Sequence, residues 1–223
     1  MEYEFLDLLI KYFDRLILPA TIATLRMVMF TMAFGSLFGF GMAVLLTLYG
    51  PKGLDPHDRI YRILDFVINT IRSFPTLILI VAMIPVTRAL VGSIIGEKAA
   101  IVPLVVVATA LIGRLLENNF KEVNPQLIEA ARSFGASNFQ IMFKVIIRES
   151  IPAMVSSLTF TTIIIISGTT IAGVVGGGGL GSIAINYGYQ SFNNYILYSC
   201  VVILVIMVIA TEYTGKFFYR RLK

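Results

Sequence analysis

The chain alternates between long apolar runs and short polar connections. Five runs have the length and composition of membrane-crossing helices: about Leu16–Tyr49, Ile63–Val86, Ala99–Gly113, Ile151–Val175 and Tyr195–Gly215. A helix needs about 20 apolar residues to cross the hydrocarbon core of a bilayer. The third run is shorter than this and contains Pro103, so its ends are the least clearly marked. The pattern predicts an all-α transmembrane protein with five helices, forming a single domain over residues 1–223.

Composition supports a lipid environment. Hydrophobic residues make up 57% of the chain and charged residues only 14%, too little charge to cover the surface of a soluble domain of this size. The first 15 residues carry four acidic side chains where a cleavable signal would have a basic region, so we expect the first apolar run to be retained. The single cysteine, Cys200, and the single histidine, His57, give no basis for a disulfide or a metal site.

Basic residues are unevenly distributed between alternate connections. The richer side comprises Lys52, Arg59, Arg62, Arg72, Arg114, Lys121, Arg132, Lys144, Arg148, Lys216, Arg220, Arg221 and Lys223. The other side has Lys11, Arg15, Arg88 and Lys98. Cytoplasmic loops carry the excess of basic residues, so five crossings place the N-terminus outside and the C-terminus in the cytoplasm. The net charge of +5 is then explained by membrane topology and lipid head groups, with no need for nucleic acid.

The predicted spans lack the side chains that a self-powered transporter needs. Their central parts contain no Asp, Glu or His, which ion-coupled carriers place within the membrane to bind charge. Arg26 is the one basic residue well inside a run, and either extends to the interface or faces a pathway. No G-x-x-x-x-G-K-[ST] phosphate loop occurs in the chain. A transporter built in this way requires an external source of energy.

The longest polar stretch lies between the third and fourth runs and predicts two short amphipathic helices, over about residues 120–148. Asn124 is a suitable N-cap and Pro125 suits the first helical position. Leu127, Ala131 and Phe134 fall on one face of this helix, and Gly135 ends it.

A second helix is predicted to open directly after this glycine. Ser137 followed by Gln140 is a capping-box pattern. The apolar stripe of this helix consists of Phe139, Met142, Phe143 and Ile146. Two helices broken at a glycine form a projection that can seat in a groove of another protein.

This segment resembles the EAA loop of the permeases of ATP-binding-cassette (ABC) importers. The resemblance rests on Glu129-Ala130-Ala131 followed by Gly135. It implies a coupling helix that docks on an ATPase subunit, with Glu129, Ala130, Ala131, Phe134 and Gly135 as the docking residues. The family pattern usually closes with Leu-Pro, whereas this chain has Ile147-Arg148, which predicts a straighter second helix than in the family. A second resemblance, to the R-S-x-P signature of amino-acid-type permeases, rests on Arg72-Ser73-Phe74-Pro75. The same residues are also consistent with a basic anchor followed by a helix kink.

The connection after the fourth run is rich in glycine. Ser167-Gly168-Thr169-Thr170 lies in the last part of that run, and four consecutive glycines, Gly176, Gly177, Gly178 and Gly179, follow it. Each glycine inside a helix costs up to about 1 kcal/mol relative to alanine. The run therefore predicts positive φ angles, a sharp reversal and close backbone approach rather than a continued helix.

The sequence from Ala172 to Phe192 resembles the methionine-uptake branch of these permeases. The resemblance implies a five-helix type I importer fold and a homodimer, two ATPase subunits that use ATP and Mg²⁺, and a substrate-binding lipoprotein or periplasmic protein, all at the bacterial plasma membrane. It makes Ser167, Thr169 and Thr170 candidates for the pathway. The candidates for contact with the binding protein are Gly176, Gly177, Gly178, Gly179, Tyr187, Tyr189 and Gln190.

The sequence therefore predicts a non-enzymatic importer permease for methionine, in the D or L form, or a close derivative. Cystine, another amino acid or a short methionine-containing peptide are alternative cargoes. A stand-alone channel, a secondary carrier and a membrane scaffold are alternatives from other classes. No sequence rule connects these candidate residues with the chemistry of methionine.

Overall fold

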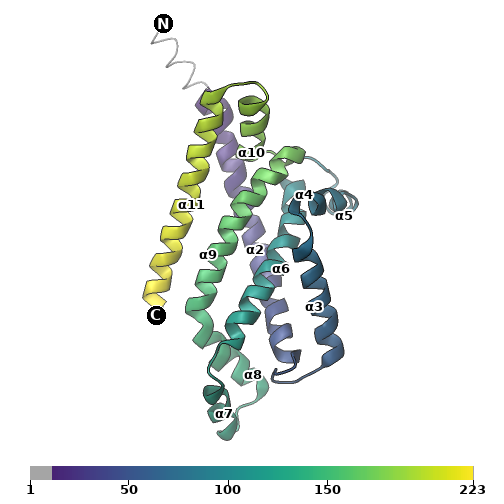
Figure 1. Ribbon diagram of the computed structural model, residues 1–223, viewed down its shortest axis with the longest axis vertical. Helices are drawn as coiled ribbons and strands as arrows, with labels where there is room; N and C mark the ends of the chain where they lie inside the picture. The colour runs from purple at the N-terminus through teal and green to yellow at the C-terminus, as the bar shows by residue number, and fades with distance from the viewer. Residues whose placement is uncertain (1–11, 223) are drawn as a thin grey trace. The chain divides into compact units, whose positions relative to one another are not determined.

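The computed structural model describes residues 12–222, and these fold almost entirely as helices (Figure 1). The α-helices are α2 (Leu18–Tyr49), α3 (Asp58–Ser73), α4 (Thr76–Ala82), α5 (Ile84–Val91), α6 (Glu97–Lys121), α7 (Pro125–Ser133), α8 (Asn138–Gln140), α9 (Ile147–Ala172), α10 (Gly179–Ile183) and α11 (Asn194–Leu222). Stretches of π-helix cover Phe13–Ile17, Ile141–Ile146, Gly173–Gly177 and Ala184–Tyr189. The basic residues Lys11 and Lys223 and three of the four N-terminal acidic residues lie outside the described part.

The predicted all-helical transmembrane class is confirmed. Within residues 12–222, four continuous helical segments are long and apolar enough to cross a membrane: Phe13–Tyr49, Glu97–Lys121, Asn138–Gly177 and Asn194–Leu222. A fifth crossing is obtained only if α3 and α4 are counted together as one broken span. The third predicted span, Ala99–Gly113, is two turns too short at its C-terminal end, because α6 continues to Lys121.

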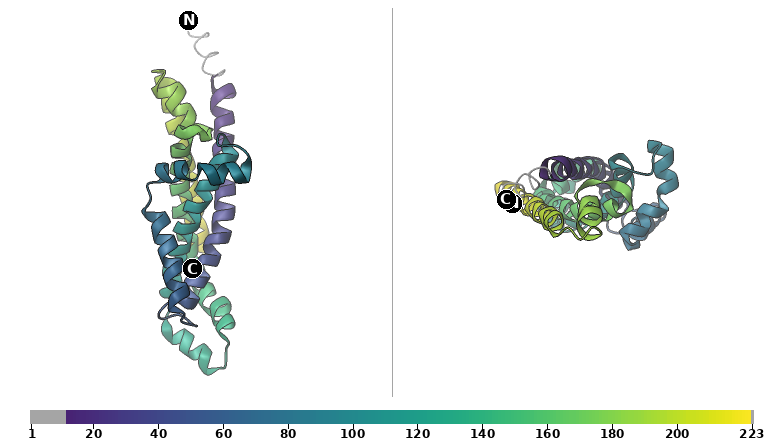
Figure 2. Two further views of the ribbon diagram at one scale, coloured as in Figure 1. Left: turned by 90° about the vertical axis from the view of Figure 1, so that its right-hand side faces the viewer. Right: turned by 90° about the horizontal axis from the view of Figure 1, so that it is seen from above.

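The second predicted span, Ile63–Val86, is wrong as one continuous helix. Phe74 and Pro75 are extended, with ψ angles of 134° and 127°, and separate α3 from α4. A residue that precedes proline avoids the helical region, and proline has no amide hydrogen to continue the ladder. A second break at Met83 separates α4 from α5, which has a proline in its first turn. In the left view of Figure 2, α4 and α5 run across the neighbouring long helices.

Two compact units divide the chain. The first comprises Met1–Ala33, Pro75–Val105 and Thr162–Thr211. Its buried residues form two apolar clusters. One consists of Ile17, Ala20, Leu180, Ala184, Ile196 and Cys200, and the other of Met27, Ile80, Ala100, Leu104 and Ala172. The first cluster joins α2 to the residues that follow α9, and the second joins α2 to α4, α6 and the last residue of α9. The core of this unit therefore holds both sides of the glycine-rich connection in place.

The second unit comprises Phe34–Phe74, Val106–Thr161 and Glu212–Lys223. Its buried cluster joins α2, α3 and α6 through Leu46, Ile68 and Ala110. Glycines let α2 and α6 approach closely. A Cβ added at Gly35 would lie 2.5 Å from the Cβ of Ala108, and one at Gly39 would lie 2.7 Å from the Cβ of Ile112. Small residues at i and i+4 are a common means of packing two helices within lipid.

We predict that Gly39→Leu destabilises the fold and that Gly41→Leu does not. The side chain at position 39 would overlap Ile112, and overpacking of this kind costs about 1–3 kcal/mol. A Cβ at Gly41, on the same helix, meets nothing within 4 Å. Thermal unfolding of the purified protein in detergent measures the difference. Equal melting temperatures for the two variants would contradict the packing of α2 on α6.

Candidate functional site

The segment around α7 forms as its sequence predicts. The Asn124 side chain accepts a hydrogen bond from the Gln126 amide at 2.9 Å, and Pro125 occupies the first turn. Gly135 has a φ of +78°, and its amide donates to the Arg132 carbonyl at 2.9 Å. The left-handed conformation at this position favours glycine, so the sharp end of α7 is set by its own sequence.

The helix after Gly135 differs from the prediction in its length. The capping box is confirmed, because the Ser137 amide donates to the Gln140 side chain at 2.9 Å and the Gln140 amide donates to the Ser137 hydroxyl at 3.3 Å. The helical segment then continues past Ile147-Arg148 into α9, and does not end as a short separate helix. With Ile147-Arg148 in place of Leu-Pro, no loop separates α8 from α9 (Figure 1).

The α7 segment presents apolar side chains to its surroundings. No residue of α7 is buried. Phe134 is 92% exposed and Phe139, across the Gly135 turn, is 70% exposed. Of the predicted stripe on the second helix, Met142 and Ile146 are buried and only Phe139 and Phe143 remain exposed. Glu129 and Ala130 are exposed beside them. The α7 segment therefore keeps exposed aromatic side chains that its own fold does not cover.

The glycine-rich connection is a tight reversal between α9 and α10. Gly176, Gly178 and Gly179 have φ angles of +92°, +77° and +74°, so the predicted left-handed backbone is present. A Cβ at Gly181 would lie 2.5 Å from the Cα of Thr170, which brings α10 into backbone contact with α9. The Leu180 amide donates to the hydroxyl of Thr24 on α2 at 2.9 Å.

This arrangement divides the predicted contact residues into buried and exposed groups, with Gly176 and Gly178 half-buried between them. Gly177 and Gly179 are buried, and a Cβ at either would fall within 3 Å of Ala100 or Thr24 respectively. They pack the connection and are not accessible to a partner. Tyr187, Tyr189 and Gln190 are exposed beyond it. Phe192, which the site prediction did not include, is 90% exposed and has a φ of +54°.

The three predicted pathway residues also differ in their exposure. Ser167 and Thr170 line an open cleft of about 220 Å³ between α9 and α11, together with Ile166, Leu204, Val205, Val208 and Ile209. Thr169 is buried, and its hydroxyl donates to the Ile166 carbonyl at 2.6 Å. Thr169 is therefore engaged by its own helix and does not face this cleft.

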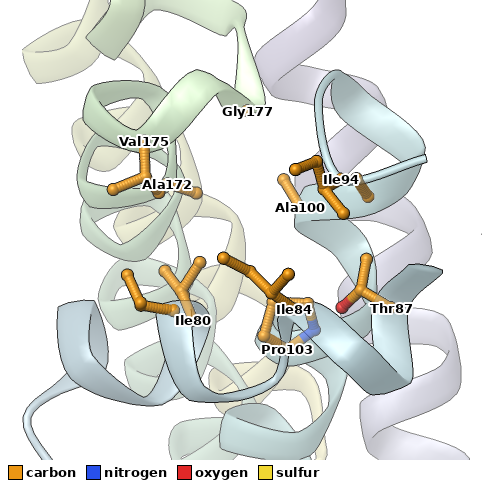
Figure 3. A pocket seen from close by; sticks show the side chains of 11 residues that line it. Ile80, Ile84, Thr87, Ile94, Ala100, Pro103, Ala172, Val175 and Gly177 are labelled. Atoms are coloured by element: carbon orange, nitrogen blue, oxygen red, sulfur yellow. The ribbon is translucent and has the colours of Figure 1, made fainter.

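A second, more enclosed cavity lies in the first unit between α4, α5 and the facing ends of α6 and α9 (Figure 3). Its walls are apolar except for Thr87, and include Ile80, Ile84, Ala100 and Pro103. The volume of about 40 Å³ has room for a few water-sized molecules at most, because one water needs about 10–15 Å³ on this measure. An amino acid does not fit in it.

Comparison with known proteins identifies the family. Residues 35–223 match the family model described as "Binding-protein-dependent transport system inner membrane component". The chain belongs to this family. It is a membrane-embedded permease subunit of the inner membrane, and not an enzyme.

Individual members of the family resemble the chain closely. It is 41% identical to a probable D-methionine transport system permease protein of Vibrio cholerae, over 92% of each chain. It is 40% identical to the methionine import system permease protein of Bacillus subtilis, over 77% of each chain. A solved inward-facing structure of the MetNI methionine ABC transporter aligns with a TM-score of 0.91 at 38% identity, over 93% of this chain and 96% of that one.

Two ion-pair sites in this permease were not predicted from its sequence. Arg26 lies 3.7 Å from Glu97 at the start of α6, so the isolated charge of the first span has a partner. Glu117, Arg114 and Asp65 form a cluster between α6 and α3. The predicted end of the third span at Gly113 left Arg114 and Glu117 in a loop. Arg26 and Glu97, like Asp65 and Arg114, are far apart in the sequence, so no local pattern connects these pairs.

We predict that Thr24→Val loosens the glycine-rich connection of the permease. The substitution keeps the size of the side chain but leaves the buried Leu180 amide without an acceptor, at a cost of about 1–3 kcal/mol. Thr24→Ser keeps the hydroxyl and is the matched control. Hydrogen exchange by mass spectrometry over residues 176–184 measures the effect. Faster exchange in Thr24→Val alone is expected; equal exchange in both variants would contradict this role of Thr24.

Proposed function

We propose that the chain is the permease subunit of an ATP-driven importer of methionine, in the D or L form, or of a close derivative. Two copies of the chain would form the membrane part. Two ATPase subunits would supply ATP hydrolysis with Mg²⁺, and an external lipoprotein or periplasmic protein would deliver the substrate. The observation that carries this proposal is the similarity, over most of the chain, to permeases whose names specify methionine.

The exposed α7 segment is the proposed docking site for the ATPase. The polar group of this site is Glu129, and the small side chains of Ala130 and Ala131 allow close packing. The apolar contact is Phe134, which projects next to the Gly135 turn. Phe134 contributes almost nothing to the fold, because it is 92% exposed. The absence of a phosphate loop from the sequence leaves the permease dependent on such a partner.

The proposed orientation has an outside N-terminus and a cytoplasmic C-terminus, with the segment of about residues 120–148 in the cytoplasm. The distribution of basic residues supports it, including Arg220 and Arg221 in the last turn of α11. In this orientation the glycine-rich connection and the residues that follow it face outward. Residues 1–223 would form one transmembrane domain.

The exposure of the candidate side chains determines which of them we assign to the pathway and to the binding-protein contact. Ser167 and Thr170 are the pathway candidates that face the cleft beside α11, whereas Thr169 is a buried support. Tyr187, Tyr189 and Gln190 are the candidates for contact with the binding protein. Gly176–Gly179 would hold that surface in place through the reversal. Alternating access would arise from movement of the two copies, driven through α7.

Reconstitution tests the proposed function. In liposomes that contain the permease, its ATPase and its binding protein, we expect uptake of radiolabelled methionine only when ATP and Mg²⁺ are present. Competition by unlabelled cystine, other amino acids and methionine-containing dipeptides tests the alternative cargoes. Robust methionine flux through the permease alone, without ATP, would instead indicate a channel or secondary carrier.

We predict that Phe134→Ala lowers ATP-driven uptake at least tenfold without loss of folded protein. The aromatic ring has few contacts within the chain, so its removal affects docking and leaves folding intact. Phe66→Ala is the matched control, because Phe66 is also exposed in the second unit but lies on α3. Uptake and co-purification of the ATPase are the measurements. Normal values of both in Phe134→Ala would refute the proposed docking site.

A further inference from the structure

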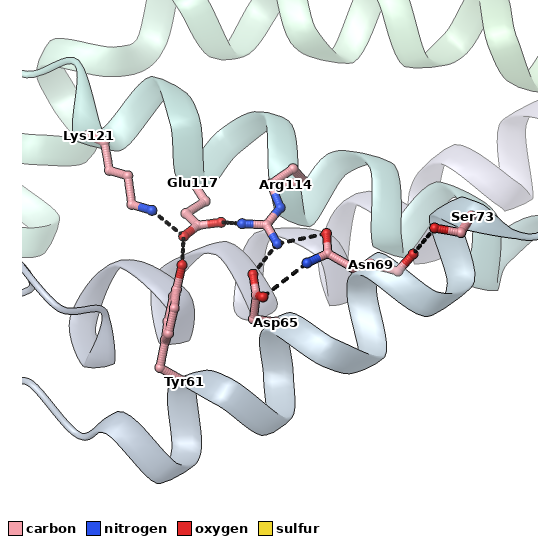
Figure 4. Close-up of polar contacts among 7 residues, drawn as sticks. All are labelled: Tyr61, Asp65, Asn69, Ser73, Arg114, Glu117 and Lys121. Atoms are coloured by element: carbon pink, nitrogen blue, oxygen red, sulfur yellow. Dashed lines mark hydrogen bonds and ion pairs between the residues drawn. The ribbon is translucent and has the colours of Figure 1, made fainter.

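A partly buried cluster of charges joins α6 to α3 in the second unit (Figure 4). Its centre is Glu117, whose side chain has no exposed surface. One Glu117 oxygen accepts hydrogen bonds from Lys121 at 2.6 Å and from the Tyr61 hydroxyl at 3.4 Å. The other accepts from Arg114 at 2.7 Å. Both oxygens of this carboxylate are therefore used.

Arg114 links α6 to α3 through its side chain. One of its terminal nitrogens donates to Glu117 on its own helix, and the other donates to Asp65 and, at 3.0 Å, to the Asn69 side-chain oxygen on α3. The Asn69 amide donates in turn to the second Asp65 oxygen at 2.9 Å. Two carboxylates and two cations take part, so the cluster as a whole is neutral.

Such a cluster fixes one register between the two helices. Apolar side chains can slide past one another at little cost, whereas a shift of α3 along α6 would separate Arg114 from Asp65 and Asn69, and Tyr61 from Glu117. Charges left without partners away from water are costly. The α3–α6 pair is therefore held in one relative position, and a force on either helix moves both.

The place of the cluster connects it with the α7 segment. Arg114, Glu117 and Lys121 lie on the last turns of α6, and only Glu122, Val123 and Asn124 separate Lys121 from α7. One residue of these turns also contacts α9: the Asn119 side chain donates to the Ser157 hydroxyl at 2.8 Å, and the Ser150 hydroxyl donates to the Asn119 carbonyl at 3.2 Å. The α7 segment is thus tied through α6 to α3, up to the break at Phe74–Pro75.

We propose that this cluster transmits movement of α7 to α3, with Glu117, Arg114 and Asp65 as positioning residues for ATP-coupled transport. The inference rests on the proposed function, because it assumes that an ATPase moves α7. Transport of an uncharged or zwitterionic cargo does not itself require charged side chains in these helices. The inference gives these charges a role in coupling. The partners it assigns are all within this chain.

The test measures the number of substrate molecules transported per ATP hydrolysed in the reconstituted complex. Asp65→Ala removes the α3 partner of Arg114, and we expect it to lower this ratio at least fivefold while ATP hydrolysis continues. Glu212→Gln is the matched control, because it breaks the Glu212–Lys216 pair, an exposed ion pair of the same unit. A variant that merely folds less well would lower transport and hydrolysis together and leave their ratio unchanged.

Rescue provides a second readout. In a Cys200→Ser background, Asp65→Cys combined with Arg114→Cys can be bridged by a short bifunctional thiol reagent. We expect the ratio to be low before bridging and to recover after it, because the bridge replaces the ion pair as a mechanical link.

The possible outcomes distinguish the two proposals. Wild-type uptake that needs no ATP would overturn the proposed function and this inference with it. ATP-driven wild-type uptake with an unchanged ratio in Asp65→Ala would overturn this inference alone. So would a ratio that stays low after the two cysteines are bridged.

Discussion

A lipid environment offers no water to solvate a charge or an unpaired backbone amide, and this constraint accounts for most of the permease's construction. The backbone meets it by forming helices. Charged side chains within the helices meet it by pairing, as Arg26 does with Glu97 and Arg114 does with Glu117. Since lipid tails are as apolar as leucine side chains, burial of apolar surface alone cannot hold the helices together. Close packing and polar contacts have to supply that cohesion, and both are concentrated where segments distant in the sequence meet.

Glycine makes the close packing possible. On α2, Gly35 and Gly39 allow α6 to pack closely. In the reversal after α9, Gly181 allows close contact with the backbone of Thr170. The same reversal is held by the Leu180–Thr24 hydrogen bond, so a connection rich in the most flexible residue is fixed at one point on α2. Rigid support beneath an exposed aromatic surface, which includes Tyr187, is a suitable arrangement for recognising another protein.

Features determined by neighbouring residues could be predicted from the sequence. The Asn124 cap, the Gly135 turn, the Ser137 capping box and the left-handed glycines all follow from local backbone chemistry. Features determined by tertiary contacts could not be predicted. Hydropathy predicted one span over Ile63–Val86, although the helix is broken at Pro75. Ser167 and Thr169 are two residues apart and look alike in the sequence, but only packing decides that Thr169 is buried. The pairing of Asp65 with Arg114 depends on helices whose register no local pattern specifies.

In the proposed mechanism an external ATPase drives the permease through α7. Site-specific photo-crosslinking tests it most directly, with a benzoylphenylalanine in place of Phe134 and, as the reference, in place of Phe66. Both side chains are exposed in the second unit, but only the first lies on the proposed docking surface. We expect a covalent adduct with the ATPase subunit from position 134 and none from position 66. Adducts from position 134 that contain only lipid, or an equal yield from both positions, would contradict it.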